Sequence, residues 1–150
     1  MSYKGRFKPK NPQRYLGDSL KIVYRSSWEL KLMMDLDTRP GIIGWCSEEV
    51  VIPYRSPVDN RLHRYYPDFY IKRRTKEGLI RETVIEVKPK AQTAEPKRPQ
   101  GKLTVKKRRS FIYEARTWSI NKAKWEAAES FCESRGWDFL IMTEFELGIV

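Results

Sequence analysis

Two short segments with alternating polar and apolar side chains, separated by a bend, constrain the fold most. Residues 67–72 have the sequence Pro-Asp-Phe-Tyr-Ile-Lys, and residues 81–88 have Arg-Glu-Thr-Val-Ile-Glu-Val-Lys. A period of two is typical of β-strands, and the Thr-Lys-Glu-Gly sequence at 75–78 favours a turn between them. We therefore predict an antiparallel hairpin over these residues.

The register of this hairpin brings two acidic side chains together. A turn centred on Glu77 places Asp68 directly across from Glu86, with Cβ atoms about 4.5–5.5 Å apart on one face of the sheet. Facing carboxylates repel each other unless a cation, a shared proton or solvent relieves the repulsion. A divalent cation would relieve it.

Oxygen ligands favour hard cations such as Mg²⁺, for which Mn²⁺ often substitutes. The carbonyl of Val87 is a further candidate ligand, and Lys88 is expected on the same face as Glu86. Carboxylates with one amine are typical of phosphodiester hydrolysis by a metal-activated water, which Lys88 would orient or help to deprotonate. The Glu-x-Lys pattern taken alone favours an ordinary surface pair instead.

A helix is predicted at residues 26–36, upstream of the hairpin. Ser26 is a suitable N-cap, apolar residues recur at helical spacing, and Pro40 and Gly41 follow the end. Glu29 stands three residues after Ser26, which is the spacing of a capping box. Capping by Glu29 and ligation of a metal by Glu29 are both open on the sequence.

The remaining elements complete an α/β fold with a mixed sheet flanked by helices. Short apolar segments predict three strands, one of which ends before Pro53 and another of which begins after Gly136. Strong helix formers before Gly136 predict a helix that ends there. The predicted strands lie at 42–45, 50–52 and 137–143, and the predicted helix lies at 120–132.

The positive charge is concentrated in two parts of the chain. The formal charge is +11, and residues 72–109 contain fourteen Lys or Arg against four Glu, whereas residues 1–27 contain seven against one. A basic stripe is typical of proteins that bind the phosphate backbone. A solvated surface or contact with an anionic membrane is the alternative, but no amphipathic helix with a basic face supports a membrane contact.

We predict a flexible basic arm at 1–18 and a single domain at 19–150, because 150 residues suit one compact core. A Pro-containing basic loop is predicted at 89–109 within that domain. The residues of this loop expected to contact DNA phosphates are Lys97, Arg98, Lys102, Lys106, Lys107, Arg108 and Arg109.

Other reactive or aromatic residues give weaker signals. Cys46, Cys132 and His63 are too few and scattered for a zinc cluster or a disulfide framework, which fits a reducing cytoplasm. We expect both thiols to be buried and assign no catalytic role to His63. Candidates for base stacking, although such residues more often fill a core, are Tyr65, Tyr66 and Trp118.

The combination of Pro67-Asp68, a hairpin and Glu86-Val87-Lys88 resembles the PD-(D/E)xK nuclease motif, whose members often carry a glutamate on an upstream helix, where Glu29 stands. The resemblance implies a restriction-endonuclease-like core and Mg²⁺-dependent hydrolysis of DNA. It also implies catalytic roles for Glu29, Asp68, Glu86 and Lys88, with metal ligation by Asp68, Glu86, Val87 and Glu29.

Motifs at 24–29, 66–69, 122–125 and 137–139 further resemble the TnsA-like transposon-end nuclease group and related phage enzymes. This likeness implies endonuclease or exonuclease action on packaged phage DNA during head completion and head–tail joining. It also implies contacts with portal or neck proteins, and a location in the host cytoplasm or at the head–tail vertex. The alternative is a non-catalytic DNA-binding protein of the phage head or neck, which needs the charge but not the carboxylates.

Overall fold

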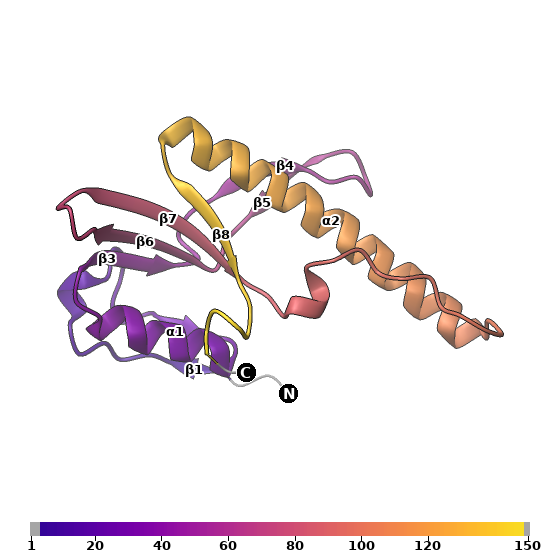
Figure 1. The fold of residues 1–150 in the computed structure, drawn as a ribbon, viewed down its shortest axis with the longest axis horizontal. Coiled ribbons are helices and arrows are strands. Elements are labelled where there is room, and N and C mark those ends of the chain that lie inside the picture. Colours follow the sequence, from indigo (N-terminus) through magenta and orange to yellow (C-terminus); the bar gives the residue numbers. More distant parts are fainter. Residues whose placement is uncertain (1–3, 149–150) are drawn as a thin grey trace.

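The computed structural model describes residues 4–148, which form an α/β fold around a four-stranded sheet (Figure 1). The strand order is β3-β6-β7-β8, and only the β7–β8 pair is parallel. Helices α1 and α2 cover opposite faces of this sheet (Figure 1). The predicted restriction-endonuclease-like core is confirmed. The bounds are β3 Ile42–Ser47, β6 Phe69–Arg74, β7 Ile80–Val87, β8 Asp138–Met142, α1 Ser27–Thr38 and α2 Val105–Arg135.

The central hairpin has the predicted register. Phe69 pairs with Ile85 at one end of the β6–β7 ladder, and Arg74 pairs with Ile80 at the other. The turn is closed by the amide of Gly78, which donates to the carbonyl of Thr75 at 2.9 Å. Gly78 has a φ of +84°, a backbone conformation that residues with a side chain rarely adopt.

Helix α1 begins where its capping residue predicts. The amide of Glu29 donates to the hydroxyl of Ser26 at 3.1 Å, so one free amide of the first turn is satisfied. Leu32, Met33 and Leu36 are buried against the sheet, which accounts for the position of the helix. The helix extends two residues beyond the predicted end, to Thr38.

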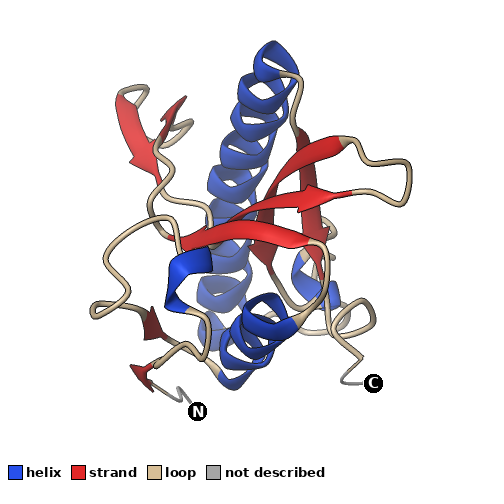
Figure 2. Ribbon diagram, turned by 90° about the vertical axis from the view of Figure 1, so that its left-hand side faces the viewer, coloured by secondary structure: helices blue, strands red, loops and turns tan. Residues whose placement is uncertain are grey.

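A second, two-stranded hairpin differs from the prediction. Strand β4 (Ile52–Arg55) continues through Pro53 and pairs with β5 (Leu62–Tyr65), apart from the main sheet (Figure 2). The predicted end at residue 52 is therefore wrong, because an isolated ribbon has edges where proline is tolerated. Strand β5 was not predicted, since three of its four residues are exposed and give no alternating pattern.

The basic run at 106–109 is helical, which corrects the predicted loop at 89–109. After the short 3-10 turn Lys90–Gln92 the chain is irregular only as far as Thr104, whose hydroxyl accepts from the amide of Lys107 at 3.1 Å. Helix α2 starts there rather than at residue 120. Lysine and arginine are good helix formers, and neither Pro nor Gly occurs between Gly101 and Gly136.

The N-terminal segment also differs from the prediction. Instead of a flexible arm at 1–18, residues 4–18 pack on the domain, and residues 1–3 lie outside the described part of the chain. Strand β1 (Gly5–Arg6) pairs with β2 (Val23–Tyr24), a 3-10 turn covers Pro12–Arg14, and Phe7 and Tyr15 are buried against Trp45.

A buried carboxylate at the end of α1 holds this segment. Asp37 is only 2% exposed, and its carboxylate accepts from the amides of Lys10 at 2.7 Å and Asn11 at 3.0 Å. A composition rich in proline and lysine does not reveal such a long-range anchor. In the described range 4–148, no helix is both long and apolar enough to span a membrane.

Candidate active site

Two carboxylates meet at the open end of the central hairpin. Asp68 immediately precedes β6, Glu86 lies near the end of β7, and the register of the hairpin sets them across from each other. The amide of Val87 donates to Oδ2 of Asp68 at 2.7 Å, which fixes this carboxylate against the neighbouring strand. Glu86 is 7% exposed.

The electrostatics of the pair are unfavourable without a counter-charge. Burial, together with the charges of Glu86 and Glu29, raises the pKa of Asp68 to about 8, against the opposing effects of the Val87 amide and Lys88. Asp68 therefore takes up a proton near neutral pH unless a cation replaces it. The carboxylates of Asp68 and Glu86 therefore form a site that needs additional positive charge.

Lys88 supplies part of that charge. Its Nζ lies 3.8 Å from Oε2 of Glu86, on the same face as the sequence predicts for residues two apart in a strand. The amide of Lys88 donates to the carbonyl of Met142 at 3.0 Å, so the backbone next to the pair is held by strand β8. The structure thus brings Asp68, Glu86 and Lys88 together.

Tyr65 is a member of the site that the sequence did not reveal. Its hydroxyl donates to Oε1 of Glu86 at 2.9 Å, and its side chain is buried. Burial and the charge of Glu86 raise the pKa of Tyr65, so it remains a donor. Tyr65 was a candidate for base stacking, but its contact with Glu86 depends on strand β5, which has no clear sequence signal.

Glu29 makes its side-chain hydrogen bond with Ser26, the N-cap of its own helix. The hydroxyl of Ser26 donates to Oε2 of Glu29 at 3.2 Å, while burial raises the pKa of Glu29. Its charge contributes to the raised pKa of Asp68, so the first turn of α1 faces the carboxylate pair. Ser26 therefore caps the helix, whereas Glu29 accepts from the Ser26 hydroxyl rather than from the Ser26 amide that a capping box would use. The ligand role predicted for Glu29 stays a prediction.

An ion pair borders the site beside Glu29. Arg25 donates to both carboxylate oxygens of Glu48 at 2.9 and 3.2 Å, and Glu48 has a φ of +56°. The amide of Glu48 donates to the carbonyl of Asp68 at 3.2 Å, which ties the end of β3 to the site. Neither residue was predicted, since no strand pattern marks the turn after β3.

The donor set fits a hard divalent cation, although its ligands are not fully assembled. Among residues 4–148, no three acidic, histidine or cysteine side chains converge as a metal site. Asp68 and Glu86 nevertheless offer two facing carboxylates whose repulsion a cation would remove, and oxygen-only donors select Mg²⁺ or Mn²⁺. These two residues are the strongest candidates to hold it.

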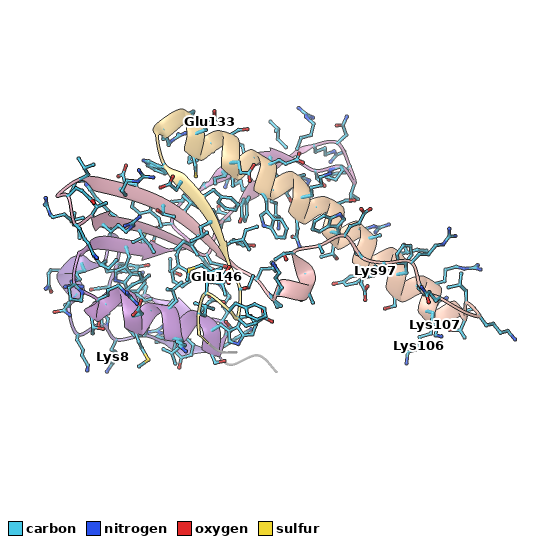
Figure 3. All side chains as sticks on the ribbon, in the orientation of Figure 1. Lys8, Lys97, Lys106, Lys107, Glu133 and Glu146 are labelled. Carbon is cyan, nitrogen blue, oxygen red and sulfur yellow. The ribbon has the colours of Figure 1, made fainter. Side chains whose placement is uncertain are left out.

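The predicted phosphate-binding residues lie on a segment that projects from the sheet. All seven are exposed: Lys97, Arg98, Lys102, Lys106, Lys107, Arg108 and Arg109. Figure 3 shows Lys97, Lys106 and Lys107 on the part of the molecule that extends past the body.

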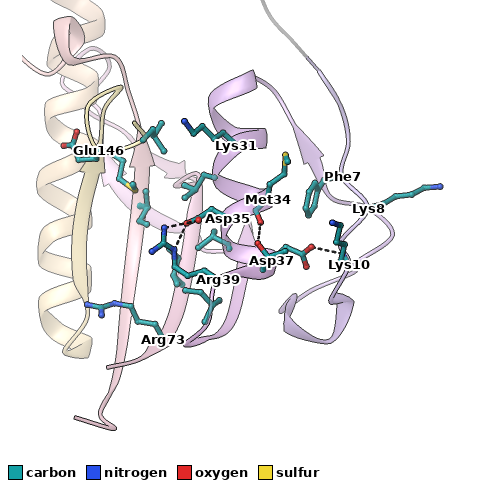
Figure 4. Close-up of a pocket in the computed structure, with 18 residues that line it drawn as sticks. Phe7, Lys8, Lys10, Lys31, Met34, Asp35, Asp37, Arg39, Arg73 and Glu146 are labelled. Carbon is teal, nitrogen blue, oxygen red and sulfur yellow. Dashed lines mark hydrogen bonds and ion pairs between the residues drawn. The ribbon is translucent and has the colours of Figure 1, made fainter. Parts of the chain in front are cut away.

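A cavity lies apart from this site. It has a volume of about 690 Å³ and lies between α1 and the sheet, lined among others by Leu36, Ile71 and Ile85 and by the Asp35–Arg39 ion pair (Figure 4). None of the predicted catalytic residues lines it. Cys46 and Cys132 are buried as expected, and His63 pairs with Asp59 on the exposed end of the β4–β5 hairpin.

A mixed four-stranded sheet between helices, with carboxylates and a lysine at the end of its central hairpin, defines the class of restriction-endonuclease-like folds. Residues 39–144 match the family model described as the TnsA-like endonuclease N-terminal domain. The chain is 43% identical over 144 residues to the head completion nuclease of Enterobacteria phage T4, which covers 96% of this chain and 93% of that protein. No solved structure matches the chain. The chain therefore belongs to the TnsA-like endonuclease family.

Proposed function

We propose that this protein is a Mg²⁺-dependent deoxyribonuclease whose active site contains Asp68, Glu86 and Lys88. One observation carries the proposal, namely that the half-buried carboxylate of Asp68 and the buried carboxylate of Glu86 face each other, with an amine 3.8 Å from Glu86. Such a pair is costly for stability alone. The arrangement suits hydrolysis of a phosphodiester.

Asp68 and Glu86 would hold the metal, with the carbonyl of Val87 and the carboxylate of Glu29 as further ligands. When bound, the metal would activate water for attack on phosphorus and stabilise charge on the phosphoryl oxygens. Mn²⁺ is expected to substitute for Mg²⁺ because both accept oxygen ligands.

The other residues prepare this site. Lys88 would orient the attacking water or accept its proton, and its charge would also attract the scissile phosphate. The amide of Val87 orients Asp68, and the hydroxyl of Tyr65 orients Glu86. These contacts restrict the carboxylates before DNA binds, which reduces the entropy lost on reaching the reactive geometry.

The substrate is proposed to be phage DNA during head completion and head–tail joining, by analogy with the name of the T4 relative. DNA phosphates would be contacted by the seven exposed basic residues Lys97, Arg98, Lys102, Lys106, Lys107, Arg108 and Arg109. Portal or neck proteins would be the partners, in the host cytoplasm or at the head–tail vertex. A non-catalytic DNA-binding role is less well supported, because it does not require the carboxylate pair.

The test is cleavage of duplex DNA by the purified protein with Mg²⁺, with Mn²⁺ and with a chelator. Asp68→Asn and Glu86→Gln should lose cleavage while they retain DNA binding, because both keep side-chain size but remove a metal ligand. Glu77→Gln is the matched control, since Glu77 lies in the exposed turn at the far end of the same hairpin. Equal cleavage by wild type and the two site variants would exclude the proposed active site.

A further inference from the structure

Residues 89–118 form a projecting arm that begins directly after Lys88. The arm consists of the segment 89–104, which runs outward, and the first half of α2 at 105–118, which returns (Figure 1). The buried residues of α2 all lie between Asn121 and Cys132, in the half of the helix that packs on the domain. The arm therefore extends beyond the core from the side of the proposed active site.

The arm carries a large excess of positive charge. It contains nine Lys or Arg against Glu95 and Glu114. Within the described residues 4–148, none of these nine cations forms an ion pair with a carboxylate. Consecutive basic residues at 106–109 also repel one another, and a polyanion would relieve this repulsion.

One face of the helical part of the arm combines this charge with exposed apolar side chains. Arg109, Ile112, Tyr113 and Arg116 have the spacing of one helix face, and all four are exposed, Tyr113 by 72%. A face of this composition matches duplex DNA, whose phosphates attract the arginines and whose groove walls accept apolar groups. An acidic protein surface would match the charge but would not explain why the arm starts at the active site.

The length of the arm sets how much duplex it can cover. The helical part has fourteen residues from Val105 to Trp118, or about 21 Å at about 1.5 Å per residue. Successive phosphates of one strand lie about 3.4 Å apart along the duplex axis, so this length corresponds to about six base pairs. Because the arm leaves the site in one direction, such a contact would be on one side of the cut.

We infer that the projecting arm is a one-sided clamp for duplex DNA. The clamp requires about six base pairs of duplex on one side of the scissile phosphate and none on the other side. This inference rests on the proposed nuclease function and adds the substrate class and its asymmetry. The active site accepts each strand in one polarity only, so the clamp lies toward the same end, 5′ or 3′, of whichever strand is cut.

The test maps cleavage along a linear duplex several helical turns long, labelled at the 5′ end or at the 3′ end of each strand. Wild-type protein should cut close to one end of each strand but stop about six nucleotides short of the other. The double variant Arg109→Gln/Arg116→Gln should cleave more slowly and lose this asymmetry. The matched control is Arg73→Gln/Lys76→Gln, which removes two exposed charges from the β6–β7 hairpin.

A symmetric cleavage pattern in wild type would overturn the clamp, and so would an arm variant with wild-type rate and asymmetry. The latter result would assign the arm to a protein partner. If wild type cuts no DNA, the proposed function fails, and the salt dependence of duplex binding still tests the arm. The arm variant should then lower the slope of log K against log [salt] by about 2, and an unchanged slope would overturn the clamp.

Discussion

Glu86 is the residue on which most of the site depends. Its side chain is buried, and each carboxylate oxygen has a partner: the hydroxyl of Tyr65 at 2.9 Å for Oε1, and Nζ of Lys88 at 3.8 Å for Oε2. A buried charge is tolerated only with such partners. These two contacts therefore stabilise the buried charge of Glu86 and also hold its carboxylate in position in the proposed active site.

Loss of the Tyr65 hydroxyl should weaken the site without unfolding the protein. Tyr65→Phe keeps the ring but removes a donor to Glu86, and loss of such supporting contacts typically costs about 10–100-fold in metal affinity or activity. The measurement is the Mg²⁺ concentration that gives half-maximal cleavage, together with the maximal rate. Tyr54→Phe is the control, because Tyr54 lies on the same hairpin and makes no described hydrogen bond to Glu86. Equal metal dependence of both variants would contradict a positioning role.

The raised pKa of Asp68 predicts how stability depends on pH. Without metal, the folded protein holds the Asp68 proton up to a pKa of about 8, whereas the unfolded chain releases it near about 4. The folded state then binds more protons between these values, so this residue makes the protein less stable as pH rises from about 4 to about 8.

Thermal unfolding of wild type and Asp68→Asn across this pH range tests the effect. The difference in unfolding temperature should move in favour of Asp68→Asn as pH rises, and Mg²⁺ should stabilise wild type most at the upper end. A constant difference across the range would show that the pKa of Asp68 is not raised. The comparison reports on Asp68 together with the facing Glu86, whose charge acts on it, because the remaining titrating groups are common to both proteins.

At the level of elements, those with local signals could be predicted and those held by distant contacts could not. The β6–β7 hairpin and α1 follow from alternation, a glycine turn and a serine cap, and they carry Asp68, Glu86, Lys88 and Glu29. Strand β5 and the N-terminal segment depend on pairing and on Asp37, which composition does not encode. The contact between Tyr65 and Glu86 was missed for the same reason.

The attachment of the N-terminal segment gives a prediction about an element. Asp37→Ala would leave the amides of Lys10 and Asn11 without their acceptor, and loss of such hydrogen bonds should lower the free energy of unfolding by about 3 kcal/mol. Asp35→Ala on the same helix is the control. Its ion pair with Arg39 is exposed, so its loss should cost less than about 1 kcal/mol.

Denaturant titration measures both variants. Similar free energies for Asp37→Ala and Asp35→Ala would mean that residues 4–18 contribute little to stability. Limited proteolysis offers a second readout, since release of the segment should expose cleavage sites at its three lysines and two arginines in Asp37→Ala alone.

In the whole molecule, strands β7 and β8 are hydrogen-bonded neighbours, yet the chain between them makes the long excursion of the arm and α2 (Figure 1). The parallel pairing is fixed by the strands and by the half of α2 that packs on them, and the outer half contributes no buried residue. Its length can therefore change in evolution without disturbing the register of the sheet. Insertions or deletions at this position would alter the reach of the enzyme along its substrate and leave its chemistry the same.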